Sequence, residues 1–193
     1  MYMTNLKPLL VMLLLGCLSV ATHAQTKSSA RKYRLSQSQS VQTDSKSKNK
    51  TIVQNFDRKG NVIEHITYND QQQIEERETF RYNRRQEVVE HAIFGQNNQL
   101  KERHVYLFNN LGKETEEQVY DKNNQLEERI VTAYNSRGQR ESETTYDSNK
   151  KMLKKTIYQY NNKGLVSERT TYNADNEVIN TRNYQYEFRK WKK

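Results

Sequence analysis

The chain has 193 residues and a formal net charge of +9, but only 33% of its residues are apolar. That apolar content is too small for two thick layers of packed structure. The positive charge is concentrated at the two ends, because residues 56–185 hold 20 basic and 21 acidic side chains. A nucleic-acid-binding protein would carry a basic stripe on its folded surface, so we expect no nucleic-acid partner.

Residues 1–24 have the three parts of a secretory signal peptide. Lys7 supplies the positive charge, residues 9–20 form the apolar segment, and Thr22-His23-Ala24 is the cleavage site before Gln25. The apolar run of about a dozen residues is shorter than the ~20 that a membrane-spanning helix needs. We therefore expect an exported protein, periplasmic or secreted.

Cys17, the single cysteine, lies inside this signal. Leu14-Leu15-Gly16-Cys17 is similar to a bacterial lipobox, in which the cysteine is lipidated and the protein becomes an outer-membrane lipoprotein. The alternative is an ordinary cysteine that is removed with the signal, and the apolar residues that follow Cys17 favour it. In either case the mature domain has no disulfide.

Residues 25–55 are rich in Ser, Gln, Lys and Thr and offer little apolar surface to bury. Such a composition cannot offset the conformational entropy that ordering costs. We predict a flexible basic linker between the signal and the domain that follows.

An aromatic residue then returns at alternating intervals of 12 and 14 residues. These anchors are Phe56, Tyr68, Tyr82, Phe94, Phe108, Tyr120, Tyr134, Tyr146, Tyr160, Tyr172 and Tyr186. A fixed period of this kind indicates a repeat architecture. Five double units of 26 residues fill the predicted β-repeat domain, residues 56–185, and residues 186–193 form a basic, aromatic C-terminal strand or tail.

Each anchor is followed by turn residues and then by a strand. Tyr134-Asn135-Ser136-Arg137-Gly138 is typical, because the Asn side chain opens a type I turn and the Gly accepts a left-handed backbone. Residues 126–134 alternate in polarity with a period of two, as a strand does. The fold prediction is all-β: an antiparallel meander of about ten strands, as a single-layer twisted sheet or a thin rolled solenoid, with the anchors in a ladder along one face.

Charged residues also recur at fixed positions. Glutamate stands eight residues after seven of the anchors, at 64, 76, 90, 102, 116, 128 and 168, and a basic residue often follows it. Neighbouring residues on a strand point to opposite faces, which predicts acidic and basic rows on opposite faces. A solvated sheet surface explains such rows, and a carboxylate row that binds a ligand is the alternative.

The sequence offers little catalytic chemistry. His65 and His91 occupy the same repeat position and could approach each other if the units stack, but the next unit has Glu117 there and His104 lies elsewhere. A zinc site needs three or four well-placed ligands. No phosphate loop or nucleophile elbow is present. We predict no catalytic residues, no metal site, no cofactor and no enzymatic activity.

Tyr106, Tyr158 and Tyr184 add a second set of aromatic residues to the repeat. Tyrosine faces stack on sugars, so these three residues are the candidate binding face. The alternative is that the tyrosines form the core of a thin sheet.

Tyr158-Gln159-Tyr160-Asn161, Tyr184-Gln185-Tyr186-Glu187 and Thr145-Tyr146-Asp147-Ser148-Asn149 resemble YD repeats. These are the β-hairpin repeats of RHS and teneurin-type proteins, where they form shells or extracellular scaffolds. Five double units are too few for an enclosing shell. The chain also resembles short, secreted, uncharacterised proteins of Bacteroides-type bacteria, which implies a cell-envelope context but no activity.

These observations together predict an exported, non-enzymatic β-repeat protein that acts as a binding or scaffold module of the cell envelope. Its partner would be an unidentified protein or glycan. Two alternatives remain: a lipid-anchored envelope protein that contacts anionic glycans or lipids, and a glycan-binding module that uses its tyrosine face.

Overall fold

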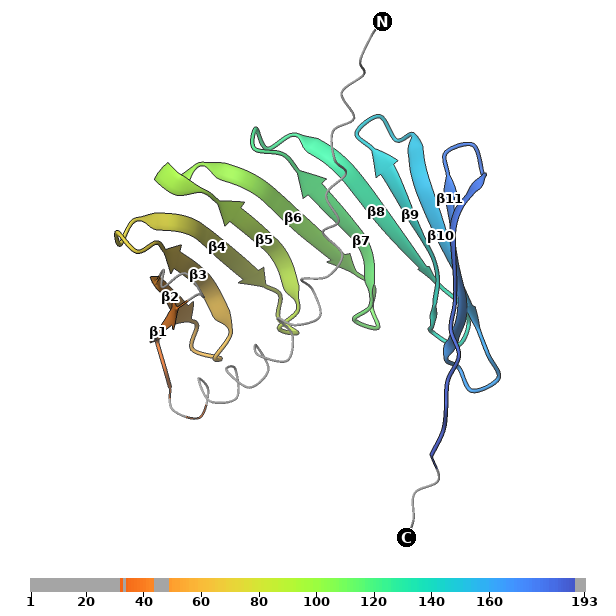
Figure 1. The fold of residues 1–193 in the computed structure, drawn as a ribbon, viewed down its shortest axis with the longest axis horizontal. Coiled ribbons are helices and arrows are strands. Elements are labelled where there is room, and N and C mark those ends of the chain that lie inside the picture. The colour runs from red at the N-terminus through yellow and green to blue at the C-terminus, as the bar shows by residue number, and fades with distance from the viewer. Residues whose placement is uncertain (1–31, 33, 44–48, 190–193) are drawn as a thin grey trace, which may run out of the picture. The chain divides into compact units, whose positions relative to one another are not determined.

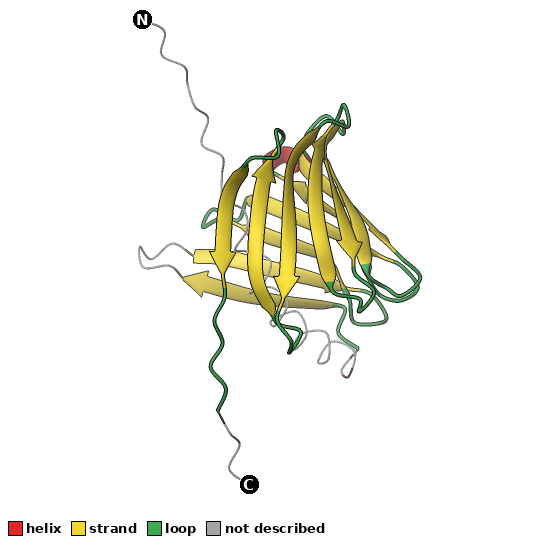
Figure 2. Cartoon of the chain, turned by 90° about the vertical axis from the view of Figure 1, so that its right-hand side faces the viewer, coloured by secondary structure: helices red, strands yellow, loops and turns green. Residues whose placement is uncertain are grey.

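The computed structural model describes residues 32, 34–43 and 49–189. Twelve strands lie in this part of the chain, and their order in the sheet follows their order in the sequence. Figure 2 shows strands joined by turns, and a short 3-10 turn, η1 (Gln96–Asn98), lies between two of the strands. The fold is an all-β antiparallel meander in one layer, as the sequence predicts. The predicted signal peptide and Cys17 lie outside the described residues.

The chain forms two compact units, residues 1–72 and residues 73–193. The first unit contains β1 (Gln37–Thr43), β2 (Asn49–Phe56) and β3 (Val62–Tyr68). β2 pairs with β1 on one side and with β3 on the other, antiparallel in both cases. Phe56, Val62 and Asn61 are its most deeply buried side chains, together with Thr51.

This first unit corrects the prediction of a flexible linker over residues 25–55. β1 and most of β2 lie in that range, although β1 is almost entirely polar. Thr51, Ile52 and Val53 of β2 pair in register with residues of β3. β1 in turn pairs with the other edge of β2 through its backbone. Pairing with an adjacent strand satisfies the backbone of a segment that buries few side chains of its own.

The second unit contains nine strands, each of which pairs with its neighbours in sequence. They are β4 (Ile74–Tyr82), β5 (Val88–Phe94), β6 (Leu100–Phe108), β7 (Glu114–Tyr120), β8 (Leu126–Tyr134), β9 (Arg140–Asp147), β10 (Met152–Tyr160), β11 (Val166–Asn173) and β12 (Val178–Asn183). The sheet is curved, since Figure 1 shows β4–β7 nearly face-on and β10–β12 edge-on. Residues 184–189 follow β12 without continuing it as a strand.

The turns have the chemistry that the sequence predicts. In the turn after β8, Asn135 Oδ1 accepts hydrogen bonds from the backbone N–H groups of Arg137 (3.0 Å) and Gln139 (2.9 Å). The Gly138 N–H donates to the Asn135 carbonyl at 2.8 Å, and Gly138 has a φ of +75°. Gln86 takes the equivalent position with a φ of +64°, which a residue with a Cβ adopts only at an energetic cost.

One turn of the second unit lacks this arrangement. Gly95 stands where the other turns have Asn or Asp, so no side chain accepts from the turn backbone. The backbone bonds of the hairpin remain, from Gly95 N–H to the Gln99 carbonyl (2.9 Å) and from Asn98 N–H to the Gly95 carbonyl (3.2 Å). Asn97 and Asn98 both have a φ of +60° there, so this turn differs in conformation from the others.

The pairing register shifts once at nearly every hairpin of the second unit, next to the anchor residue. A bulge of one residue turns all later side chains to the other face. The anchors therefore alternate between the two faces, and the predicted ladder along one face is wrong. The same shift separates the glutamates: Glu102 and Glu128 point to one face, and Glu90 and Glu116 to the other.

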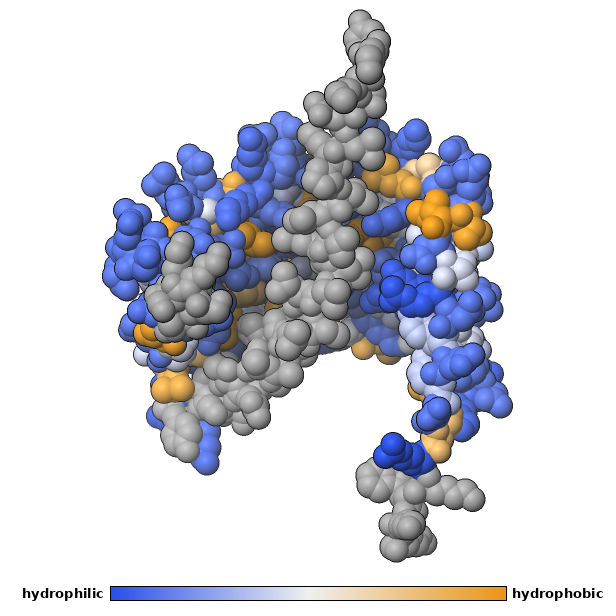
Figure 3. Space-filling model, in the orientation of Figure 1, coloured by the Kyte–Doolittle hydropathy of each residue, from blue (hydrophilic) through white to orange (hydrophobic). Residues whose placement is uncertain are grey.

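Few side chains are buried deeply. In the second unit they are small, namely Ala92 and the threonines Thr132, Thr144, Thr145, Thr156 and Thr170. Figure 3 accordingly shows hydrophilic residues over most of the visible strands, with apolar residues in small groups between them. The sheet is held by its backbone ladder and by cross-strand pairs of half-buried side chains.

Tyrosine hydroxyls add a regular set of long-range bonds. Tyr134 Oη donates to the carbonyl of Glu114 at 2.7 Å, and Tyr160 Oη donates to the carbonyl of Arg140 at 2.7 Å. Tyr186 Oη makes the same bond to Val166 at 2.8 Å. Each bond reaches back 20 residues to the first residue of an earlier strand, from the last residue of a strand for Tyr134 and Tyr160 and from the segment after β12 for Tyr186, so these anchors pin successive hairpins together.

Candidate functional site

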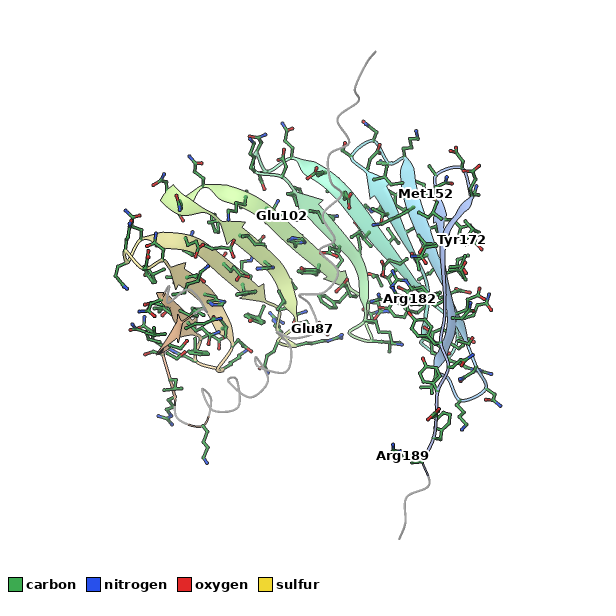
Figure 4. All side chains as sticks on the ribbon, viewed as in Figure 1. Glu87, Glu102, Met152, Tyr172, Arg182 and Arg189 are labelled. Carbon is green, nitrogen blue, oxygen red and sulfur yellow. The ribbon has the colours of Figure 1, made fainter. Side chains whose placement is uncertain are left out.

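One face of the second unit carries a row of side chains across all nine strands, which is aromatic or charged on every strand except β8, where Thr132 stands. We call it the histidine face and define it by the register pairs Phe80–His91 and His91–His104. Strand alternation and the register place the remaining members on the same side: Glu78, Glu102, Tyr106, Glu114, Glu117, Thr132, Arg140, Glu143, Tyr158, Arg169, Arg182 and Tyr184. Glu102 and Arg182 mark its acidic and basic ends in Figure 4.

The acidic end is built around four stacked rings. Phe80 and His91 lie with ring centroids 4.6 Å apart and an interplanar angle of 7°. His104 continues the stack 5.9 Å from His91, and Tyr106 lies 6.1 Å from His104. The rings come from β4, β5 and β6, so the stack runs across the strands and fixes the orientation of both imidazoles.

Carboxylates bracket the two histidines. His91 Nε2 lies 2.7 Å from Glu78 Oε2, and His104 Nδ1 lies 2.7 Å from Glu117 Oε1. His104 Nε2 is also 3.1 Å from Glu102 Oε1. Both ring nitrogens of His104 thus face a carboxylate oxygen, which suits the doubly protonated imidazolium.

The pKa of His104 reflects this environment. Burial of the ring by itself lowers the pKa, but the hydrogen bond to Glu117 and the negative charges of Glu117 and Glu102 outweigh it, so the pKa is raised. His104 consequently holds a proton to higher pH than an exposed histidine does.

Burial raises the pKa of the Tyr106 hydroxyl strongly, and the charges of Glu117 and Glu114 raise it further. Burial and the charge of Glu117 also raise the pKa of Glu114. Tyr106 therefore remains a neutral phenol over the whole physiological range. The acidic end is a half-buried network of hydrogen-bonding groups with an excess of negative charge.

The basic end lies on β9–β12. Arg140 Nη1 donates to Glu143 Oε2 at 2.8 Å. The guanidinium carbons of Arg140 and Arg169 each lie 5.9 Å from the centroid of the Tyr158 ring. Burial alone would lower the pKa of Arg140, but the hydrogen bond with Tyr158 and the charge of Glu143 raise it. Arg182 lies directly opposite Arg169 in the register of β11 and β12.

The candidate tyrosines predicted from the sequence all lie on the histidine face. Tyr106 is on β6, Tyr158 is on β10, and Tyr184 follows β12, where its N–H donates to the Ser167 carbonyl at 3.0 Å. They occupy one repeat position, which Phe80 and Thr132 fill in the intervening units. Thr132 is buried and has no ring, so the tyrosines do not form a continuous ladder.

Other members of this face were not predicted as site residues. His91, Glu117, Glu143 and Arg169 also share one repeat position, on the strands that alternate with those of the tyrosines. The sequence already placed His91 and Glu117 at that position; extending the alignment of the 26-residue units to Glu143 and Arg169 would have revealed its change from His through Glu to Arg. The direct opposition of His91 and His104 depends on the hairpin register, which the sequence did not reveal. His65 lies on β3 of the first unit, opposite Gln54.

The opposite face repeats a different cluster. The Arg103 guanidinium lies 3.9 Å from the Tyr120 ring centroid and 3.4 Å from Glu90, and its Nε donates to Asn124 at 2.8 Å. Arg129 similarly lies 2.9 Å from Glu116 and 5.8 Å from the Tyr146 ring. Each arginine there has a carboxylate and an aromatic partner, so these clusters serve to hold adjacent strands together.

Within the described part of the chain, no group of three or more His, Cys, Asp or Glu side chains is arranged to hold a metal ion. The same residues contain no helix that is long and apolar enough to cross a membrane.

Neither a family model nor a curated protein matches this chain. Among solved structures, it is similar to a protein of unknown function from Bacteroides fragilis, with 16% identity over 55% of this chain and 90% of that one and a TM-score of 0.43. A porin-like protein from Bacteroides uniformis has 12% identity over 78% of this chain and 55% of that one, with a TM-score of 0.39.

A DUF3836 family protein from Bacteroides vulgatus has 18% identity over 57% of this chain and 99% of that one, with a TM-score of 0.29. None of these three proteins is described as a YD-repeat protein. Their TM-scores lie below 0.5, so they support no inference about activity or ligand.

Proposed function

We propose that this protein is an exported, non-enzymatic binding module of the bacterial cell envelope, and that the histidine face is its binding surface. The observation that carries the proposal is the row of side chains, aromatic or charged on every strand except β8, that crosses nine strands of a single-layer sheet. A row of this kind is costly for a structural surface, because half-buried charged groups lose hydration.

The histidine face also differs in organisation from the opposite face. The arginines Arg103 and Arg129 each have a carboxylate and an aromatic partner on the opposite face, in the same arrangement 26 residues apart. On the histidine face the equivalent positions change chemistry along the sheet, from His91 through Glu117 to Arg169.

The histidine face supports binding better than it supports catalysis. Its hydrogen-bonding groups are spread over many strands, whereas catalytic groups are usually gathered in one concave pocket. A surface of this shape suits an extended ligand such as a glycan or a protein segment. Export to the envelope remains part of the proposal, since it rests on the signal-like residues 1–24.

Affinity capture from a cell-envelope fraction tests this proposal. The full chain is immobilised, and bound proteins and glycans are identified by mass spectrometry. Glu117→Gln and Tyr158→Ala, on the histidine face, should reduce the captured partner. Gln159→Ala, an exposed residue on the opposite face, is the matched control and should not. Equal capture by all variants would reject the histidine face as the binding surface, and turnover of envelope glycans or peptides by the full chain would reject a non-enzymatic role.

A further inference from the structure

Arg169 and Arg182 are directly opposed on β11 and β12. Directly opposed residues of an antiparallel pair have Cβ atoms about 4.5–5.5 Å apart, and like charges in this position destabilise a sheet. Four other arginines on the strands of the second unit have a carboxylate partner, namely Arg81, Arg103, Arg129 and Arg140. Within residues 73–189, no ion pair joins Arg169 or Arg182 to a carboxylate.

The two arginines differ in their surroundings. The Arg169 guanidinium carbon lies 5.9 Å from the Tyr158 ring centroid, and Arg169 is half-buried, whereas Arg182 is exposed on the last strand. Arg140 approaches the same ring at the same distance, but Glu143 compensates its charge. The result is a site with two uncompensated guanidinium groups, one oriented and one accessible.

Guanidinium groups bind carboxylate and phosphate oxygens through paired hydrogen bonds. An oxyanion between Arg169 and Arg182 would remove the repulsion that the free sheet retains. Tyr184 lies next to this pair, because it follows Arg182 by two residues and its N–H donates to the carbonyl of Ser167. No ring stacking or cation contact involves Tyr184 within residues 73–189, so its ring is available for an apolar surface such as the face of a pyranose.

We propose that Arg169, Arg182 and Tyr184 form a subsite for an acidic sugar, whose carboxylate or phosphate group binds the two arginines while its ring stacks on Tyr184. The proposal rests on the histidine face being a binding surface and names the ligand class for its basic end. In Figure 4, Arg182 marks the position of this subsite on β12.

Calorimetric titration of the full chain with trigalacturonate, glucose 6-phosphate and maltotriose tests the subsite. Binding of trigalacturonate identifies the anion as a carboxylate, and binding of glucose 6-phosphate identifies it as a phosphate ester. Neutral maltotriose should not bind measurably. Arg182→Ala should weaken binding at least tenfold, and affinity should fall as salt is added, since the contact is ionic. Arg137→Ala removes the same charge from an exposed turn and should change affinity less than twofold.

Two further measurements separate recognition from folding. Tyr184→Ala should weaken binding of the sugar but leave binding of inorganic phosphate unchanged. The thermal midpoint of Arg182→Ala should equal or exceed that of the wild type, because the substitution removes a repulsion.

A lower midpoint would make Arg182 a structural residue and overturn the proposal. Failure of both acidic sugars to bind, or equal binding by Arg182→Ala, would also overturn it. Capture of an envelope partner that depends on Glu117 but not on Arg182 would overturn the subsite alone and leave the proposed function intact.

Discussion

Replacing Gly95 by Asn should stabilise the second unit, because Gly95 opens the only hairpin turn between residues 73 and 189 in which no side chain accepts from the turn backbone. In the equivalent turn after β4, Asn83 Oδ1 accepts from the N–H groups of Arg85 (2.9 Å) and Glu87 (3.1 Å). Asn at 95 can form the same two bonds if the turn adopts the common conformation.

The size of the gain follows from three contributions. Each new hydrogen bond contributes about 0.5–1.5 kcal/mol net. Replacing Gly reduces the entropy of the unfolded chain, which adds about 0.4–1 kcal/mol. Against this, a Cβ at position 95 would lie 2.8 Å from Lys101 Cε, so the flexible lysine must move and give up its exposed ion pair with Glu76, worth about 0–1 kcal/mol. Together these contributions predict a net stabilisation of about 0.4–4 kcal/mol.

Urea unfolding monitored by tyrosine fluorescence and circular dichroism measures this gain in the free energy of unfolding as a higher midpoint concentration of urea. The m-value, the slope of that free energy against urea concentration, should stay unchanged. The reverse substitution, Asn135→Gly, is the matched control, because it removes two such bonds from a regular turn and should destabilise by a similar amount. If Gly95→Asn leaves the midpoint unchanged while Asn135→Gly lowers it, then the turn at 95 does not adopt the common conformation. If neither variant shifts the midpoint, the side-chain bonds contribute nothing to stability and the reasoning is refuted.

Three other predictions concern the histidine face, the tyrosine bonds and the N-terminus. The raised pKa of His104 in the folded state stabilises the protein at acidic pH, and this stabilisation is lost as pH rises through that pKa. His104→Gln should therefore lower the free energy of unfolding more at pH 5 than at pH 8. Glu117→Gln should lower the pKa of His104 in an NMR titration, whereas an unchanged pKa of His104 would contradict the contact with Glu117. Tyr160→Phe removes a 2.7 Å hydrogen bond to the backbone of β9 and should lower the free energy of unfolding in urea by about 0.5–1.5 kcal/mol. The natural Phe108 shows that the repeat accepts a ring without the hydroxyl. An unchanged free energy of unfolding would mean that water replaces the bond. Cys17→Ala should leave the protein's distribution between membrane and soluble fractions unchanged if the signal is cleaved before Gln25, and release from the membrane would establish a lipid anchor instead.

The turns show how much of this fold follows from local sequence. Asn135 and Gly138 carry out their roles within five residues, because one side chain bonds to its own backbone and the other accepts a positive φ. Neither role depends on distant parts of the chain, so the hairpins, their alternating lengths and the single-layer meander were all predictable. The polar strands β1 and β2 were not, since their order depends on pairing with a neighbour and little on their own composition.

The candidate site shows the limit of that reasoning. The sequence alone determined that Tyr106, Tyr158 and Tyr184 share one repeat position, and the structure places them on one face. Which other residues share that face depended on the bulges, because a shift of one residue reverses every side chain that follows. The opposition of His91 to His104, and of Arg169 to Arg182, was therefore decided only in the tertiary structure, where the register of each hairpin is set.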